Sequence, residues 1–188
     1  MPFSNSPFRR AAEALEAKAA LDAPGKPVRA VAGKLLSPAP VKAALSGSWL
    51  GHALHPILTD VVIGSFVSAS VLDLVGGEDG EAGAERLLAV GIASYAPTAL
   101  TGVSDWADRA GDDAGVRRVG IVHAAGNAIA LSLYTASLAS RRAGSQQRGK
   151  LLALAGGAVM GIGGYLGGHL AYVQRVGVET RPAPAAAS

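Results

Sequence analysis

Four long apolar stretches constrain the fold of this chain more than any other feature. They cover residues 56–75, 87–104, 119–140 and 151–174, and the last three contain no Lys, Arg, Asp or Glu. A helix needs about 20 predominantly apolar residues to cross the hydrocarbon core of a bilayer, so each stretch is long enough, or nearly so, to span it. Short connections make consecutive helices antiparallel. The sequence therefore predicts an all-α integral membrane protein, an up-down bundle of four helices.

A water-soluble four-helix bundle is the alternative to this interpretation. Soluble helices keep a polar face along their length, whereas the apolar residues here form continuous blocks. The first span is the weakest, because it contains Asp60 and Asp73. A carboxylate at the bilayer centre costs on the order of 2.5–3.5 kcal/mol on insertion scales, so we expect both to face the bundle interior or to lie near an interface.

The spans divide the chain into three parts: a leader of residues 1–50, a transmembrane domain of residues 51–178 and a tail of residues 179–188. The leader is a polar-to-amphipathic sequence, and the prolines at positions 24, 27, 38 and 40 interrupt it. We expect it to be a partly ordered segment on the cytoplasmic side or in the interface, with Trp49 at the level of the headgroups. The Pro- and Ala-rich tail is expected to be disordered.

The distribution of basic residues predicts the orientation. With four passes both termini lie on one side, and that side carries 12 of the 17 Lys and Arg residues. The positive-inside rule therefore places both termini in the cytoplasm, in a multi-pass protein of the cell (inner or plasma) membrane. The third connection, residues 141–150, argues against this orientation, because it would place four basic residues on the outer side.

All four histidines are expected at one end of the bundle. His52 and His55 precede or open the first span, His123 lies just inside the third, and His169 lies near the end of the fourth. In an up-down bundle these positions share one face of the membrane. Imidazole is the common protein ligand for haem iron and for non-haem transition metals. The pattern predicts a site for haem b or a transition metal formed by these four residues.

Polar or small residues also form one stripe on each span. The third helix carries His123, Asn127, Ala130 and Tyr134 at helical spacing, and the fourth carries Gly161, Tyr165, His169 and Tyr172. Lipid penalises polar groups, so these stripes are expected to face the bundle centre. The residues expected to support the imidazoles by hydrogen bonding are Asp60, Asp105, Asn127 and Tyr165.

The fourth span is rich in glycine, and two interpretations remain open. The first is close helix packing through small residues four apart, using Gly157 with Gly161 and Gly164 with Gly168. The second is that the missing side chains leave room for a flat macrocycle beside His169.

Several functions are not supported by the sequence. The chain has no cysteine, which excludes disulfides, thiolate zinc sites, iron–sulfur ligation and covalent c-type haem within it. No nucleophile elbow, ordered catalytic triad or phosphate-binding loop is present, so an enzyme with its own substrate is not indicated. Basic residues interleaved with aromatics on a folded face are absent, and nucleic-acid binding is not expected.

Four motifs resemble a known family of bacterial membrane proteins, domain of unknown function 2231. They are GHALHPILTD from Gly51 to Asp60, PTALTG from Pro97 to Gly102, Asp105-Trp106, and GGYLGGHL from Gly163 to Leu170, with Gly177-Val178 trailing. The sequence departs from the family at Ala53 and Val62, where proline is expected. The resemblance implies a four-helix membrane protein. In some relatives a Rieske iron–sulfur domain follows, which implies redox work and, for this chain, a separate Rieske-type or other redox partner.

Three functional hypotheses follow. The first is a haem- or metal-binding protein of membrane electron transfer. The second is a non-catalytic membrane scaffold or anchor for a redox partner. The third is a small transporter or proton relay that uses His123, Asn127, Asp60 and Asp105.

Overall fold

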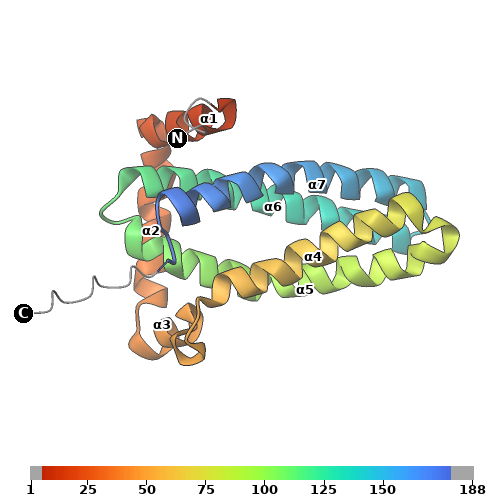
Figure 1. Ribbon diagram of the computed structural model, residues 1–188, viewed down its shortest axis with the longest axis horizontal. Coiled ribbons are helices and arrows are strands. Elements are labelled where there is room, and N and C mark those ends of the chain that lie inside the picture. Colours follow the sequence, from red (N-terminus) through yellow and green to blue (C-terminus); the bar gives the residue numbers. More distant parts are fainter. Residues whose placement is uncertain (1–5, 179–188) are drawn as a thin grey trace, which may run out of the picture.

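Four long helices run alternately up and down the molecule, and shorter helices cross one end of them (Figure 1). This computed structural model describes residues 6–178, and the tail predicted to be disordered lies outside these residues. The described part is helical throughout, without strands. Its long helices are α4 (Leu54–Val75), α5 (Gly77–Arg109), α6 (Ala114–Arg142) and α7 (Gln146–Gly168), the last continued by a π-helical turn over His169–Val173.

The four predicted spans are confirmed, and each helix is longer than its apolar stretch. All four are long and apolar enough to cross a membrane. The largest difference is at the first connection, where the acidic segment expected to form a loop is the helical start of α5. Only Gly76 separates α4 from α5, and Gly77 makes the reversal possible with a φ of 56°. Hydropathy detects the part of a helix that lipid covers, whereas the helix itself extends into water.

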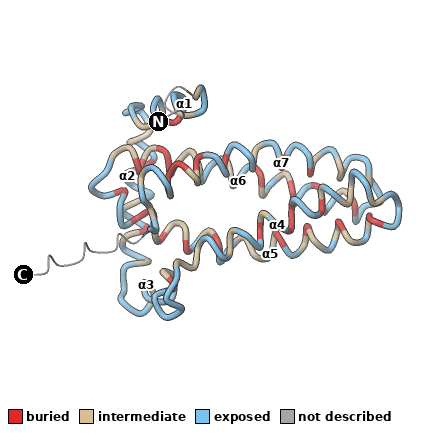
Figure 2. The backbone as a smooth tube through the Cα atoms, viewed as in Figure 1, coloured by how far each residue is buried: buried red, intermediate tan, exposed pale blue. Residues whose placement is uncertain are grey.

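The outer surface of the bundle is apolar. Within the most apolar 18-residue window of each span, only 22–28% of the residues are buried inside the protein, and Figure 2 shows the exposed residues on the outside of all four helices. The exposed side chains include Val67, Val71, Ile129 and Ile162. A soluble bundle would place such residues inside. This surface fits a lipid environment, as expected for an integral membrane protein.

The helices pack as two close pairs, α4 with α5 and α6 with α7, and fewer contacts join the pairs. The rings of Phe66 from α4 and Tyr134 from α6 stack with centroids 3.7 Å apart and so connect one pair to the other. Both side chains belong to a buried cluster that also contains Leu88 of α5 and Ala153 of α7. This cluster closes the bundle on the side away from the shorter helices.

Glycines of α7 set the register of the α6–α7 pair. Gly149, Gly156, Gly163 and Gly167 lie 7, 7 and 4 residues apart, and the α6 residues that each one faces, Arg141, Tyr134, Asn127 and His123, repeat these spacings in the opposite direction. A Cβ atom at each glycine would lie 2.5–3.3 Å from the facing side chain. Close packing is thus the role of these glycines. The four positions predicted for it, Gly157, Gly161, Gly164 and Gly168, make almost no such contact.

The leader is more ordered than the sequence suggested. It forms three helices, α1 (Pro7–Ala17), α2 (Asp22–Leu36) and α3 (Ala39–Ser46), and α2 lies across the end of the bundle (Figure 1). Asp22 accepts hydrogen bonds from Arg117 and Arg118 at the start of α6, at 2.8–3.2 Å. These bonds, of which those from Arg118 have the largest effect, hold the pKa of Asp22 well below its usual value. This docking could not be predicted from the sequence, because the contacts that form it join residues about 95 positions apart.

Ion pairs neutralise the opposite end of the bundle. Arg141 of α6 binds Asp73 of α4 through two hydrogen bonds of 2.8 and 2.5 Å, and both side chains are nearly inaccessible to solvent. Asp73 therefore faces inward, which is one of the two positions expected for it. Two further pairs, Arg142 with Glu85 and Lys150 with Glu81, join the third connection to the start of α5.

Candidate functional site

A cavity of about 450 Å³ lies between the two helix pairs, in the half of the bundle nearer the leader. Most residues that line it are apolar or glycine, and they come from all four long helices. Val28 of α2 also lines it, so the leader contributes to its wall. Among the polar groups that reach it are His55 and His123.

His55 lies in the first turn of α4, where Pro56 favours the start of a helix. Its Nδ1 lies 3.0 Å from the carbonyl oxygen of Thr98 and 3.1 Å from the hydroxyl of Thr101, both on α5. The imidazole packs on Gly102, where a Cβ atom would lie 2.6 Å from Cε1 of the ring. The PTALTG motif thus supplies both the acceptor for this histidine and the space that it fills.

His123 is held by α7 in the same way. Its Nδ1 lies 2.9 Å from the carbonyl oxygen of Gly163, and its ring packs on Gly167, where a Cβ atom would lie 2.9 Å from Cε1. The amide of Asn127, one turn further along α6, lies 3.0 Å from Nε2. The GGYLGGHL motif therefore positions a histidine of the neighbouring helix, and its glycines are needed for the approach.

The hydrogen bonds assign one tautomer to both histidines. A carbonyl oxygen only accepts, so the facing Nδ1 must carry the proton. Nε2 is then unprotonated in each neutral ring and keeps its lone pair. In His123 this lone pair accepts from Asn127, whereas no described residue hydrogen bonds to Nε2 of His55. A histidine whose Nδ1–H donates to a backbone carbonyl while Nε2 stays available is typical of metal-ligating imidazoles.

The other two histidines do not reach the cavity. His169 is buried against the leader, with its Nε2 2.6 Å from a carboxylate oxygen of Glu16, which also accepts from Gln174. His52 is exposed in the segment before α4. Of the four histidines predicted to form one site, the structure thus places two, His55 and His123, at the cavity. One residue along a helix is a rotation of about 100°, so Gly168 lines the cavity while His169 faces the leader.

The predicted supporting residues are placed differently from one another. Asp60, Asp105 and Asn127 all line the cavity, whereas Tyr165 is partly exposed and packs on Phe8 of α1. Of the three in the cavity, only Asn127 hydrogen bonds to a histidine. The groups that orient the imidazoles are mainly the carbonyls of Thr98 and Gly163, which sequence analysis missed because every residue has a carbonyl.

The stripe predicted on the third helix is confirmed, and the stripe on the fourth is confirmed only in part. Along α6, Asn127 and His123 face the cavity and Ala130 and Tyr134 are buried. On the fourth span, Gly161 faces open space and Tyr165 is exposed. Tyr172 lines the cavity but its side chain is largely exposed, and His169 is buried. The buried side of α7 is instead the row of glycines that receives α6.

The ligand set limits what the cavity could hold. Between residues 6 and 178, no three His, Asp or Glu side chains are grouped so as to bind a metal ion. A free transition metal normally takes three or more protein ligands. Haem needs one or two axial ligands, because the macrocycle supplies the rest. The two imidazoles therefore fit haem better than a mononuclear metal.

Four apolar helices around a histidine-lined cavity define a polytopic membrane protein. The chain belongs to the family described as "Predicted membrane protein (DUF2231)", whose family model matches residues 51–180. The match covers all four spans, and α1 to α3 precede it. No curated protein and no solved structure matches the chain.

Proposed function

We propose that this protein binds haem b in the cavity between its helix pairs and transfers electrons in the cell membrane. His55 and His123 would hold it through their imidazoles. The observation that carries the proposal is the shared arrangement of these two residues, each with Nδ1–H donated to a carbonyl of the neighbouring helix. A bound haem would supply one-electron chemistry. A separate redox protein, of Rieske type or another, would be its partner.

The residues of the chain have three tasks in this proposal. Thr98, Thr101 and Gly163 fix the tautomer and the plane of the imidazoles. The apolar lining excludes water, and its volume lies in the usual range of 300–1,000 Å³ for ligand cavities. The amide of Asn127 donates to Nε2 of His123, the atom that would hold the iron, and would therefore compete with a bound haem.

Haem titration into the detergent-purified protein tests this proposal. The wild-type chain is expected to bind haem in a 1:1 ratio and to show the Soret and visible bands of a six-coordinate iron. Replacing either His55 or His123 with Ala should abolish the six-coordinate spectrum. His52→Ala is the matched control, because His52 is exposed and outside the cavity, and it should bind as the wild type does. Absence of a Soret shift in the wild type, or equal spectra for all three variants, would contradict the proposal.

A proton or solute relay is the second candidate, and the positions of two carboxylates favour it. Asp60 and Asp105 line the same cavity as the two histidines. Ionisable groups inside a bundle often mark the path of an ion. This function predicts pH-dependent flux in proteoliposomes that Asp60→Asn removes. Flux that the variant leaves unaltered would exclude Asp60 from such a path.

We further infer that the leader end of the bundle faces the cytoplasm. The basic residues of the third connection had opposed this orientation, but Arg141, Arg142 and Lys150 each pair with an acid of α4 or α5. Arg86 and Arg148 form no ion pair at that end, whereas five cations of the leader form none within residues 6–178: Arg10, Lys18, Lys26, Arg29 and Lys34. The leader end therefore has the stronger unpaired positive charge.

Single cysteines test the orientation, because the chain has none of its own. Ala23→Cys places a thiol on the exposed side of α2, and Gln147→Cys places one at the opposite end. A membrane-impermeant maleimide added to spheroplasts is expected to label Gln147→Cys at once and Ala23→Cys only after lysis. The reverse order would show that the leader lies outside.

A further inference from the structure

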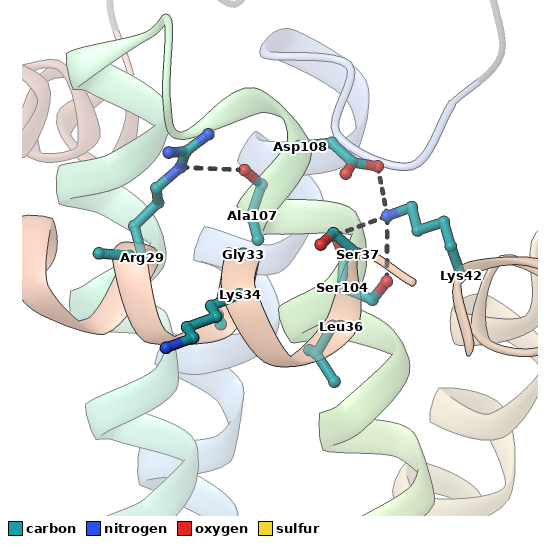
Figure 3. A pocket seen from close by; sticks show the side chains of 11 residues that line it. Arg29, Gly33, Lys34, Leu36, Ser37, Lys42, Ser104, Ala107 and Asp108 are labelled. Carbon is teal, nitrogen blue, oxygen red and sulfur yellow. Dashed lines mark hydrogen bonds and ion pairs between the residues drawn. The ribbon is translucent and has the colours of Figure 1, made fainter. Parts of the chain in front are cut away.

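A second hollow, of about 460 Å³, lies outside the bundle between α2, α3 and the end of α5 (Figure 3). Arg29 and Lys34 line it from α2, and Lys42 lines it from α3. Asp108 is the single acid among the residues that line it. Three cations against one carboxylate favour an anionic ligand.

The ammonium group of Lys42 already has partners within the protein. Its ammonium group donates to the carbonyl and the hydroxyl of Ser104, at 2.9 and 3.0 Å, and forms an ion pair with Asp108. Figure 3 shows this three-way contact on one side of the hollow. Lys42 thus holds α3 on the end of α5, and its charge is balanced by Asp108.

Arg29 and Lys34 keep most of their donors available. Arg29 makes one long hydrogen bond, from Nε to the carbonyl of Ala107 at 3.4 Å. None of the ion pairs formed within residues 6–178 includes either side chain. The surface of α2 between Arg29 and Lys34 is formed by Ala30 and Gly33, which have little or no side chain to fill the hollow. The geometry leaves two uncompensated cations beside an open depression.

The orientation of α2 places this hollow at the level of the lipid headgroups. Val28 lines the cavity inside the bundle although it is 46% exposed, so that side of α2 borders the spans. Val31 and Leu35 follow Val28 by three and seven residues, lie on the same side and are 59% and 64% exposed. The guanidinium of Arg29 instead lies against Gly111, in the connection beyond the end of α5. An apolar side toward the spans and basic residues elsewhere characterise a helix that lies in the membrane interface.

We propose that this hollow binds the phosphate group of an anionic phospholipid. Arg29 and Lys34 provide the charge, and the guanidinium can donate two parallel hydrogen bonds to phosphate oxygens. Val31 and Leu35 lie beside the acyl chains on the lower side of the helix. This apolar side favours a lipid over free phosphate, which would use the cations alone. The site is separate from the histidine cavity and does not depend on haem binding.

Native mass spectrometry of the full chain in detergent tests this site, with phosphatidylglycerol, phosphatidylcholine and inorganic phosphate as separate ligands. Basic residues near anionic lipid contribute roughly a factor of five each in affinity, so the double variant Arg29→Gln/Lys34→Gln should bind phosphatidylglycerol about 30-fold more weakly. Lys26→Gln is the matched control on the same helix, outside the lining, and should leave the affinity unchanged. Val31→Ser/Leu35→Ser should also weaken phosphatidylglycerol binding.

Three results would overturn the proposal. The first is equal affinity of the wild type for phosphatidylcholine and phosphatidylglycerol, which would show that the charge is not recognised. The second is wild-type affinity in the double variant. The third is phosphate binding that depends on Arg29 and Lys34 while phosphatidylglycerol binding does not, which would make the ligand a free anion. All these residues except Arg29 are exposed, and unchanged melting temperatures would show that the variants fold.

Discussion

Arg141→Met is expected to destabilise the protein by about 3–5 kcal/mol, whereas Arg142→Met is expected to cost less than about 1 kcal/mol. The two residues are adjacent in sequence, and both form an ion pair. The pairs differ in burial: the side chains of Arg141 and Asp73 are 0% and 3% exposed, against 62% and 31% for Arg142 and Glu85. Removing Arg141 leaves a carboxylate without a partner inside the bundle, whereas Glu85 remains in contact with solvent.

The buried pair also holds three helices together. Nε of Arg141 donates to the hydroxyl of Ser137 at 3.3 Å, and this hydroxyl donates to the carbonyl of Gly149 on α7 at 2.7 Å. Asp73 is on α4, so the network joins both helix pairs at the end away from the leader. Loss of the guanidinium therefore disturbs α4, α6 and α7 together.

Thermal unfolding in detergent, followed by circular dichroism, measures these effects. The double variant Arg141→Met/Asp73→Leu should recover most of the loss, because replacing a buried ion pair with apolar groups is often nearly neutral. Equal destabilisation by Arg141→Met and Arg142→Met would contradict the assignment. Failure of the double variant to recover would show that the Ser137 network, and not the unpaired charge, dominates the cost.

The four spans and their alternating up-and-down course could be predicted from sequence, because lipid imposes the same requirement on every residue of a span. A polar group at depth is costly, so the sequence limited Asp73 to an inward or an interfacial position. Its partner could not be inferred, because Arg141 lies 68 residues further on in a stretch that sequence analysis treated as a loop. Hydropathy carries no information about such pairs.

The end of the bundle at which the histidines lie could be predicted, but not whether each side chain faces the cavity. The alternation of the spans puts His55, His123 and His169 at the same end of the bundle. Which of them faces the cavity depends on the rotation of each helix. That rotation is set by the fit of α6 side chains onto glycines of α7, a property of two helices together. The matching spacings of 7, 7 and 4 residues on the two helices are a signal that could have revealed it.

The order of the leader was underestimated for a related reason. From its sequence, only a partly ordered segment was expected. Its docking depends on charged contacts with the start of α6 and on Glu16, which bonds to His169 from 153 residues away. The same contact explains why His169 is absent from the cavity, since its polar partner belongs to the leader.

Gly120→Ala is expected to destabilise the protein by about 1–3 kcal/mol, the usual cost of overpacking a close contact. Gly120 faces the indole of Trp106, and a Cβ atom there would overlap the pyrrole edge of this ring. The ring is almost fully buried, and its Nε1 donates to the carbonyl of Val116 at 3.0 Å, which fastens the end of α5 to the start of α6. An added methyl group must displace the ring, weaken this bond or separate the helices.

Gly126→Ala is the matched control, six residues further along the same helix. No atom lies within 4 Å of the Cβ position at Gly126, so the variant is expected to stabilise α6 by about 0.5–1 kcal/mol through helix propensity alone. The two substitutions therefore have opposite expected signs in thermal unfolding. Gly120 and Trp106 also line the histidine cavity, so Gly120→Ala should weaken haem binding, whereas Gly126→Ala should not. Destabilisation by both variants would mean that helix packing against glycine, and with it the wall of the cavity, is arranged differently from this structure.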